Sequence, residues 1–288
     1  MKVGYLGPPK LTFGYQAAKK FAANKNHVEL ISFSSHQEVC LAIIKKEIDV
    51  GIVAIENSID GIVNENIRII DRLHRGRNLL ICGEIELPIS LFFLRRADAQ
   101  GLPTQLTAHE KAKGQSSRKV AKFLEANKIS DFTPAKSNGA AVQAAKNDPS
   151  VVAIGLAEAA EICNLALVEP ESITDGDKNY TRFWALSLKD AKPTKKDKTC
   201  FLLNSDQPVP GGVAKVLAEF AAEKINLWLI APVSIEGRTW EYSFLLEFEG
   251  NFDDPRMERA YNAACGCGGA MDGLIRLGSY PIGTTVRR

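Results

Sequence analysis

The chain has 288 residues, of which 24% are charged and 45% hydrophobic, and its formal net charge is +2. This length predicts one large or two ordinary domains, and the small net charge argues against a nucleic-acid-binding surface. No apolar run approaches the roughly 20 residues needed to span a bilayer, and residues 1–3 lead directly into a strand-like run without the pattern of a signal peptide. We therefore expect a cytoplasmic protein that binds neither nucleic acid nor membrane.

The first half of the chain alternates short apolar runs with helical patterns. Because strands that alternate with helices form parallel sheets, we expect an α/β fold of two lobes that resembles a periplasmic-binding-protein-like pair. A small ligand would then bind in the cleft between the lobes, at the carboxyl ends of the strands. The expected strands are 2–6, 28–33, 50–55, the strand-rich stretch 79–93, 105–107, one near Phe132 and 151–154, and the expected helices are 15–23, 37–46, 64–73, 115–126, 139–145 and 156–163.

A linker is expected at residues 189–198, which show no apolar period and contain Pro193 and five lysines. The two-lobed half would therefore span residues 1–188. Beyond the linker, residues 199–281 follow the order β-α-β-β-α-β of the ferredoxin-like unit, and a tail covers 282–288. The expected strands are 199–204, 225–233, 239–249 and 273–280, and the expected helices are 211–223 and 253–265.

The six cysteines stand mostly alone in apolar segments, where a free Cys commonly serves as a small core hydrophobe. Cys265 and Cys267 form the one close pair in the sequence. They lack the second pair or the nearby His of a zinc site, so we expect no metal.

Thr181, Arg182 and Phe183 place a hydroxyl donor, a fixed cation and an aromatic ring in consecutive positions after a polar loop. That combination suits a small, multiply anionic substrate that loses a hydroxyl group. Taken alone, the tripeptide also fits the start of an exposed strand, in which Thr and Phe are present for their β-propensity.

Glu56, Asn57 and Ser58 follow the buried strand at the edge where a ligand is expected. Their side chains and the amides of the turn suit an anion, but Asn and Ser also commonly bond their own backbone in such turns. Ser137 and Asn138 precede a predicted helix, where N-capping and substrate contact are both open.

In their order and spacing, these motifs resemble prephenate dehydratase carrying a C-terminal ACT regulatory domain. The resemblance implies a carbon–oxygen lyase of phenylalanine biosynthesis, which converts prephenate to phenylpyruvate by decarboxylating dehydration without a metal or organic cofactor. It also implies a homodimer or homotetramer, and it leaves prephenate and arogenate open as substrates. The matching segments are 3–8, 51–58, 108–116, 137–141, 181–183, 225–227, 240–242 and 277–281.

The resemblance implies a role for each residue that matches its motifs. Thr181 is expected to donate a hydrogen bond to the departing hydroxyl, Arg182 to hold a carboxylate and Phe183 to form an apolar wall. The other residues expected to contact the substrate are Thr12, Glu56, Asn57, Ser58, Gln115, Ser116, Ser137 and Asn138.

The chain departs from the family pattern at several positions. The loop 9–14 gains one residue and has Gly14 in place of a serine, Ser90 replaces a histidine, and the segment after His109 is changed. The ACT segment 231–234 lacks the Glu and Arg of related enzymes, so phenylalanine is expected to inhibit weakly or not at all. The expected effector contacts are Gly211, Gly212, Val213 and Asn226.

Two other functions remain open from the sequence. A prephenate decarboxylase that does not aromatise the ring needs the same anionic site but no help for the hydroxyl, and the retained Thr181 argues against it. A non-catalytic sensor of amino acids or keto acids would fit the two lobes and the altered loops.

Overall fold

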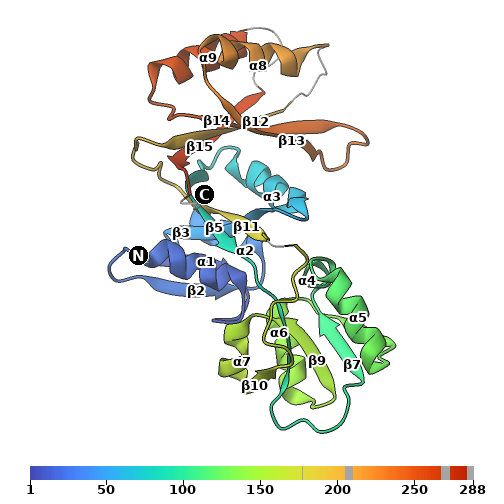
Figure 1. Cartoon of the computed structure of the whole chain (residues 1–288). Coiled ribbons are helices and arrows are strands. Elements are labelled where there is room, and N and C mark those ends of the chain that lie inside the picture. Colours follow the sequence, from blue (N-terminus) through green and yellow to red (C-terminus); the bar gives the residue numbers. More distant parts are fainter. Residues whose placement is uncertain (177, 205–209, 267–272, 284–288) are drawn as a thin grey trace.

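The computed structural model describes residues 1–176, 178–204, 210–266 and 273–283. These residues form three sheets that follow one another along the molecule, as Figure 1 shows. We call the middle part the first lobe (β1–β5 and β11), the green and yellow-green end the second lobe (β6–β10), and the orange end the C-terminal unit (β12–β15). The predicted tail 282–288 lies largely outside the described residues.

The first lobe has a six-stranded sheet in the order β2-β1-β3-β11-β5, with β4 beside β3. Strand β1 runs parallel to β2 and β3, whereas β11 returns from the second lobe and runs antiparallel to both of its neighbours. Its elements are β1 (Lys2–Leu6), α1 (Phe13–Ala22), β2 (Glu29–Phe33), α2 (His36–Ile44), β3 (Val50–Asn57), β4 (Gly61–Ile62), α3 (Asn64–His74), β5 (Leu80–Pro88) and β11 (Tyr180–Ser187).

The second lobe has a five-stranded sheet in the order β10-β6-β9-β7-β8, in which β7 runs parallel to both β8 and β9. Two short elements, α4 and β10, escaped the sequence prediction because they are too short to show a period. Its elements are β6 (Phe92–Arg96), β7 (Gln105–Ala108), α4 (Glu110–Gly114), α5 (Ser117–Asn127), β8 (Asp131–Pro134), α6 (Asn138–Asn147), β9 (Val151–Gly155), α7 (Ala157–Cys163) and β10 (Leu165–Leu167).

The C-terminal unit has an antiparallel four-stranded sheet in the order β13-β14-β12-β15. Helices α8 and α9 cover its outer face, and its inner face lies on the first lobe (Figure 1). Its elements are β12 (Asp197–Leu203), α8 (Gly212–Ala222), β13 (Leu227–Ser234), β14 (Tyr242–Glu249), α9 (Pro255–Gly266) and β15 (Leu274–Pro281).

The segment predicted as a linker is shorter than expected, because β12 begins at Asp197. Asp197 and Lys198 are 3% and 2% exposed, so the last lysine of that segment is a buried residue of the sheet. Its lysine-rich composition suggested solvent, but Lys198 is paired with carboxylates from the first lobe. Composition alone does not reveal such a partner.

The C-terminal unit and the first lobe share one hydrophobic core. Trp184 and Leu186 of β11 belong to the same buried cluster as Leu245 of β14 and Leu277 of β15. Gly278 of β15 has φ +142°, and a Cβ atom there would lie 2.4 Å from the backbone oxygen of Ile81 in β5. Only glycine permits so close an approach, which explains the Gly of the motif at 277–281.

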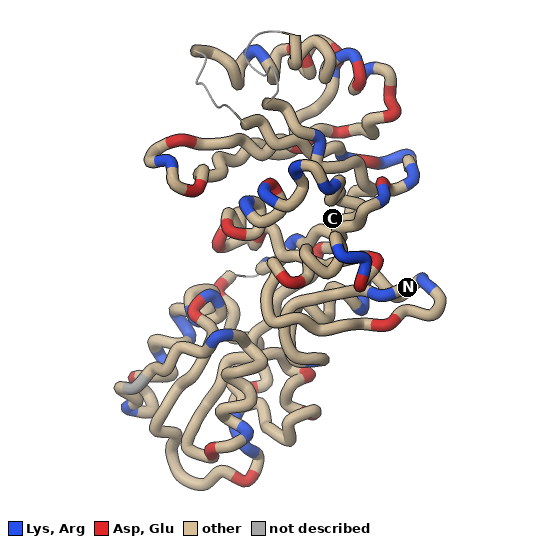
Figure 2. The backbone as a smooth tube through the Cα atoms, turned by 180° about the vertical axis from the view of Figure 1, so that it is seen from behind, with Lys and Arg blue, Asp and Glu red and all other residues tan. Residues whose placement is uncertain are grey.

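Figure 2 shows Lys and Arg interspersed with Asp and Glu over all three parts of the molecule. In the described part of the chain, no helix has the length and apolar character that crossing a bilayer requires.

Candidate active site

A pocket of about 330 Å³ lies where the first lobe meets the second lobe. It is bounded by the carboxyl ends of β1 and β7, by the loop before α6, and by the start of β11. This is the edge at which open α/β sheets bind ligands. Its apolar lining includes Phe13, Val63, Ile89, Leu91, Ala112 and Phe183.

Strand β11 presents alternate residues to the pocket. Thr181 and Phe183 line it, and Phe183 and Ala185 belong to the core cluster on that side of the sheet. Trp184 belongs to the cluster shared with the C-terminal unit. Because successive side chains of a strand point to opposite faces, Arg182 lies on the face away from the pocket.

The hydroxyl of Thr181 is oriented by Asn57. The Asn57 amide oxygen accepts from the backbone N–H groups of Ile59 and Asp60 at 2.9 and 3.1 Å, which fixes the amide orientation. Its Nδ2 then faces Thr181 Oγ1 and the Tyr180 backbone oxygen, both at 3.0 Å, and donates one of its two protons to this pair of acceptors. Since a hydroxyl has one proton to give, Thr181 accepts on this side and keeps its proton for another acceptor.

A chain of side-chain amides continues from Asn57 to the second lobe. Asn57 Nδ2 donates to Asn179 Oδ1 at 2.7 Å, and Asn179 Nδ2 donates to Gln115 Oε1 at 3.0 Å. Gln115 Nε2 donates to Asp60 Oδ2 at 2.6 Å, and Gln115 also lines the pocket. Gln115 is therefore part of the pocket wall, and Asn57 supports that wall from outside the pocket.

Ser58 and Ser116 lie beside this chain of amides. The Ser58 hydroxyl accepts from Tyr180 N at 2.9 Å, which ties the turn after β3 to the start of β11. The Ser116 side chain is fully buried at the start of α5, and its hydroxyl makes no hydrogen bond with the described residues. Neither serine is among the residues that line the pocket of about 330 Å³.

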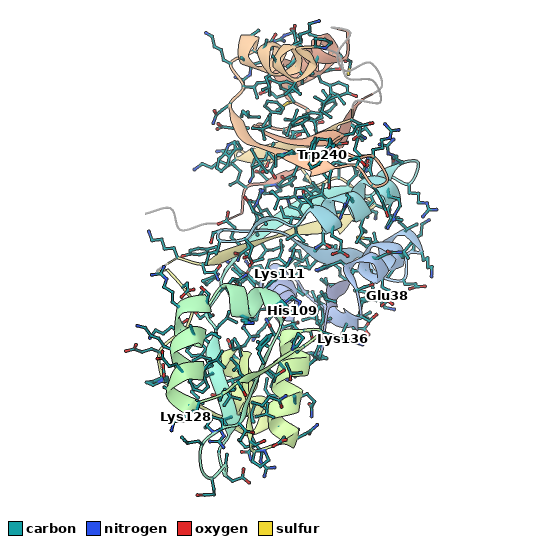
Figure 3. All side chains as sticks on the ribbon, turned by 90° about the vertical axis from the view of Figure 1, so that its right-hand side faces the viewer. Glu38, His109, Lys111, Lys128, Lys136 and Trp240 are labelled. Carbon is teal, nitrogen blue, oxygen red and sulfur yellow. The ribbon has the colours of Figure 1, made fainter. Side chains whose placement is uncertain are left out.

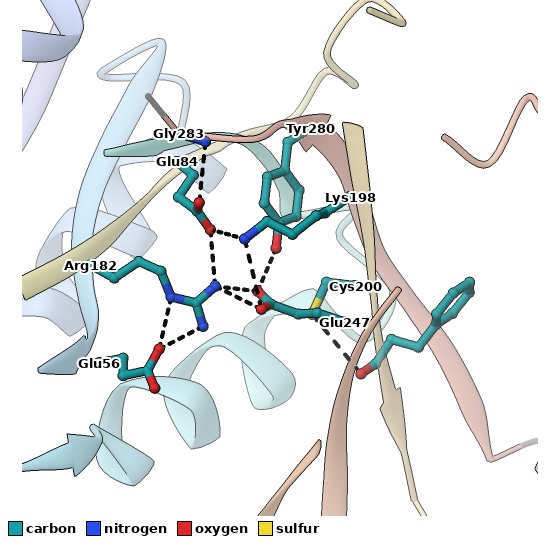
Figure 4. Close-up of polar contacts among 9 residues, drawn as sticks. Glu56, Glu84, Arg182, Lys198, Cys200, Glu247, Tyr280 and Gly283 are labelled. Atoms are coloured by element: carbon teal, nitrogen blue, oxygen red, sulfur yellow. Dashed lines mark hydrogen bonds and ion pairs between the residues drawn. The ribbon is translucent and has the colours of Figure 1, made fainter. Parts of the chain in front are cut away.

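Arg182 and Glu56 contact each other, as Figure 4 shows, and neither residue lines the pocket. Arg182 Nε donates to Glu56 at 2.9 Å, and its Nη1 donates to Glu84 at 2.9 Å and to Glu247 at 2.7 Å. This arrangement differs from the prediction that both residues contact the substrate. The physical reason is the two-residue period of the strand, which separates Arg182 from Thr181 and Phe183.

Three of the helices that begin at the pocket or in the groove that adjoins it have a side-chain N-cap. Thr12 caps α1 by accepting from Tyr15 N at 3.3 Å, and Ser137 caps α6 by accepting from Ala140 N at 3.1 Å. Ser35 caps α2 in the same way in the adjoining groove. The first turns of helices carry unpaired N–H groups and a partial positive charge, which favour anions. Asn138 adds a buried Oδ1 that makes no hydrogen bond with the described residues.

Two lysines of the second lobe, Lys111 on α4 and Lys136 before α6, line the pocket. Figure 3 shows them with His109 on the side of the second lobe that faces the first lobe. Lys111 and Lys136 were not among the site residues expected from the sequence. Lys111 could have been identified from the changed segment after His109, because that change places a cation beside a predicted ligand-binding edge.

The two histidines of the pocket are neutral at neutral pH. Burial, with a smaller contribution from Lys111, lowers the pKa of His36 to about 4. Burial and Lys111 also lower the pKa of His109, against the opposing effect of Glu110. The positive side chains of the pocket at neutral pH are therefore its lysines.

The altered loop 9–14 retains its capping role. Lys10 turns the chain with φ +64°, after which Thr12 caps α1. A Cβ atom at Gly14 would lie 2.8 Å from the backbone oxygen of Leu6. The glycine at this position therefore lets α1 pack directly on β1.

The predicted effector residues lie near the ends of α8 and β13. Gly211 has φ +74° and precedes α8, Gly212 and Val213 begin that helix, and Asn226 accepts from Glu249 N at 2.9 Å. Residues 205–209, which precede this turn, lie outside the described residues.

Comparison with known proteins connects this geometry to a family. A sequence profile described as "Prephenate dehydratase" matches residues 3–191. The chain belongs to the prephenate dehydratase family. It is an enzyme that converts prephenate to phenylpyruvate in phenylalanine biosynthesis, which confirms the activity that the motifs predicted.

Individual relatives agree with the family match. A bifunctional chorismate mutase/prephenate dehydratase of Aquifex aeolicus (strain VF5) is 30% identical over 260 residues, which cover 90% of this chain and 68% of that protein. A prephenate dehydratase of Lactococcus lactis subsp. cremoris (strain MG1363) is 30% identical over 257 residues and covers 87% of this chain and 88% of its own.

Solved structures share the fold. Prephenate dehydratase from Arthrobacter aurescens, crystallised with L-Phe, superposes with a TM-score of 0.81 at 24% identity, over 98% of this chain and 90% of that one. GqqA, described as a novel type of quorum quenching acylase, superposes with a TM-score of 0.79 at 19% identity over 100% of both chains. At these identities the superpositions establish the α/β fold and carry no statement about substrate.

Proposed function

We propose that prephenate binds in the pocket between the lobes and that Thr181 donates a hydrogen bond to its departing hydroxyl. The observation that carries this proposal is the bond from Asn57 Nδ2 to Thr181 Oγ1, 3.0 Å long, on the pocket wall. This bond holds the Thr181 oxygen in place and leaves the hydroxyl proton for donation to another acceptor. A donor fixed before the reaction stabilises charge that develops on the leaving oxygen.

The two carboxylates of prephenate need positive partners in a site with neutral histidines. Lys111 and Lys136 supply them from the second lobe, and the first turns of α1 and α6 supply N–H groups from the two lobes. Charge-assisted hydrogen bonds of this kind are roughly twice as strong as neutral ones. Arg182 is already bound to three carboxylates and is not needed as a substrate anchor.

The chemistry requires the loss of one carboxylate and one hydroxyl from the ring. The bond from the ring to the carboxylate breaks, its electron pair enters the ring, and the C4–O bond breaks, so that carbon dioxide and water leave after one proton is taken up. Phe183, Ile89 and Leu91 place apolar surface beside the ring. A less solvated carboxylate loses carbon dioxide more easily, and aromatisation drives the step without a cofactor.

We further propose that the C-terminal unit is an ACT domain and that it responds weakly to phenylalanine. Its β-α-β-β-α-β order supports this assignment, and the Arthrobacter aurescens relative was crystallised with L-Phe. Gly211, Gly212, Val213 and Asn226 are the proposed effector contacts. We propose a homodimer or homotetramer as the working assembly.

An assay with prephenate tests the proposal by identifying the product. Phenylpyruvate, detected by its absorbance in alkali, is the expected product, and arogenate is assayed beside prephenate to define the substrate. A non-aromatic keto acid would indicate a decarboxylase, and the absence of turnover with tight binding would indicate a sensor.

A further inference from the structure

A buried charge cluster connects the strand that carries Thr181 to the C-terminal unit. It consists of Glu56, Glu84, Arg182, Lys198, Glu247 and Tyr280 (Figure 4). We propose that Arg182 is a positioning residue, which fixes β11 against the C-terminal sheet and thereby sets the place of the Thr181 hydroxyl. This inference rests on the proposed role of Thr181.

The guanidinium of Arg182 binds carboxylates from three strands. Glu56 belongs to β3, Glu84 to β5 and Glu247 to β14 of the C-terminal unit, with N–O distances of 2.9, 2.9 and 2.7 Å. The side chains of Glu84 and Glu247 are both 1% exposed. Solvent therefore screens the contacts of Arg182 with Glu84 and Glu247 little, and a change on either side of this part of the cluster reaches the other.

The C-terminal unit contributes two more members. Lys198 Nζ lies 2.6 Å from Glu84 and 4.0 Å from Glu247, and the Tyr280 hydroxyl donates to Glu247 at 2.6 Å. Burial by itself would raise the pKa of Glu84, but Lys198 and Arg182 more than offset this and lower it, so the carboxylate stays charged. Burial also raises the pKa of Tyr280, which therefore remains a donor.

The cluster is directly coupled to Thr181 through the pairing of β11 with β3. Arg182 lies opposite Glu56 and Thr181 opposite Asn57, and the register then shifts between Arg182 and Phe183 so that Ile55 is an extra residue on β3. Such bulges re-aim side chains near active sites. Adjacent residue pairs thus fix the guanidinium on one face and the hydroxyl on the other.

Lys198 extends the cluster toward the proposed effector segment. Its Nζ lies 4.7 Å from the ring centroid of Trp228, which stands two positions after Asn226. A displacement of β13 therefore reaches Thr181 through Lys198, Glu84 and Arg182. This gives the C-terminal unit a route to the hydroxyl that does not pass through the substrate pocket.

Steady-state kinetics with prephenate distinguish a positioning residue from a substrate anchor. Arg182→Lys keeps the charge but cannot bind three carboxylates in one plane. A misplacement of the order of 1 Å costs roughly 10²-fold in rate, so we expect kcat to fall by about 10- to 100-fold while KM stays within about threefold of wild type. A raised KM with unchanged kcat would overturn the proposal, because it would make Arg182 a substrate anchor.

A second pair of variants tests the route from the C-terminal unit. As a single substitution, Glu247→Gln should lower kcat. Added to Arg182→Lys, it should cause little further loss of kcat, because both substitutions break the same link. Glu247→Asp should restore part of the lost kcat. Additive losses, or a wild-type kcat in Glu247→Gln, would overturn the coupling.

Tyr280→Phe and Glu223→Gln complete the design. Tyr280→Phe removes one hydroxyl without a charge, so it keeps the test valid if the charge variants do not fold, and a wild-type kcat in it would then count against the proposal. Glu223→Gln breaks an Arg–Glu pair between α8 and α9 and should leave kcat unchanged. Thr181→Val is measured in parallel. If Thr181→Val keeps full turnover, the proposed role of Thr181 is wrong. If Thr181→Val loses turnover while the cluster variants keep a wild-type kcat, only the positioning role of the cluster is wrong.

Discussion

At the scale of single residues, the hydroxyl of Thr181 is held in place by an amide whose own orientation is set by the backbone. Thr181→Val keeps the shape and removes the hydroxyl, so we expect turnover to fall by roughly 10²- to 10³-fold with an unchanged fold. The kcat for phenylpyruvate formation and the circular dichroism spectrum measure this. Thr239→Val, at an exposed position before β14, serves as a control. Near-normal turnover in Thr181→Val would remove Thr181 from the mechanism.

Lys111 and Lys136 are expected to act in binding. Replacing either by Met removes one charge-assisted hydrogen bond, which is worth about 1.5–3 kcal/mol, so KM should rise by roughly 10- to 100-fold. The value of kcat should change little. Lys128→Met is the matched control, because Lys128 lies at the exposed end of α5 (Figure 3). A KM equal to that of wild type in both pocket variants would place the carboxylate partners elsewhere.

His36 makes the free energy of unfolding depend on pH. Its pKa is lowered to about 4 in the folded chain, against about 6.5 in the unfolded chain. The stabilisation from the neutral ring is therefore complete above pH 6.5 and is lost as the pH falls toward 4, at up to about 1.4 kcal/mol per pH unit. Urea denaturation of wild type and His36→Asn between pH 7 and pH 5 measures this. We expect the difference in unfolding free energy between wild type and His36→Asn to become smaller as the pH falls. A difference that stays constant would refute this prediction.

At the scale of elements, β11 shows what the sequence could and could not predict. The alternation of helices and strands identified most elements to within two or three residues, because their apolar periods are clear. The motif at 181–183 was interpreted as one cluster facing the substrate. The same period-2 rule that predicts strands places Arg182 on the other face, so this part was predictable in principle.

Other features of the site could not be predicted from local patterns. The partners of Arg182 come from β3, β5 and β14, which are far apart in the sequence. Lys198 had a linker-like neighbourhood, and its buried partners Glu84 and Glu247 distinguish it from a solvated lysine. Pairings of this kind depend on tertiary contacts, which a single sequence does not display.

Gly278 fixes the approach of β15 to β5. A Cβ atom there meets the Ile81 oxygen at 2.4 Å, and the φ of +142° is unfavourable for any other residue. Gly278→Ala should therefore destabilise the chain by at least about 2 kcal/mol, which thermal unfolding would reveal. Gly237→Ala is the matched control, because Gly237 also has a positive φ, of +77°, but has nothing within 4 Å. Equal effects of the two substitutions would show that backbone strain, not the close approach, decides the loss.

At the scale of the whole molecule, regulation by phenylalanine is expected to be weak. Ala231 to Ser234 supply neither an acidic nor a basic side chain to an amino acid, and an unpaired buried charge costs several kcal/mol. A loss of only about 1.4 kcal/mol in binding free energy lowers the affinity for phenylalanine tenfold. Calorimetric titration beside the dehydratase assay measures this, and micromolar binding with strong inhibition would contradict it.

The core that β5 and β11 share with β14 and β15 joins the C-terminal unit to the first lobe, and another core cluster runs from the first lobe into the second lobe. The chain crosses between the first lobe and the second lobe twice, once after β5 and once before β11 (Figure 1). In the proposed complex, prephenate would meet Lys111 and Lys136 on the second lobe and Thr181 on the first lobe. A ligand bound to the C-terminal unit would act instead through the sheet that packs against β11, so we expect it to change the position of the Thr181 hydroxyl and not that of the two lysines.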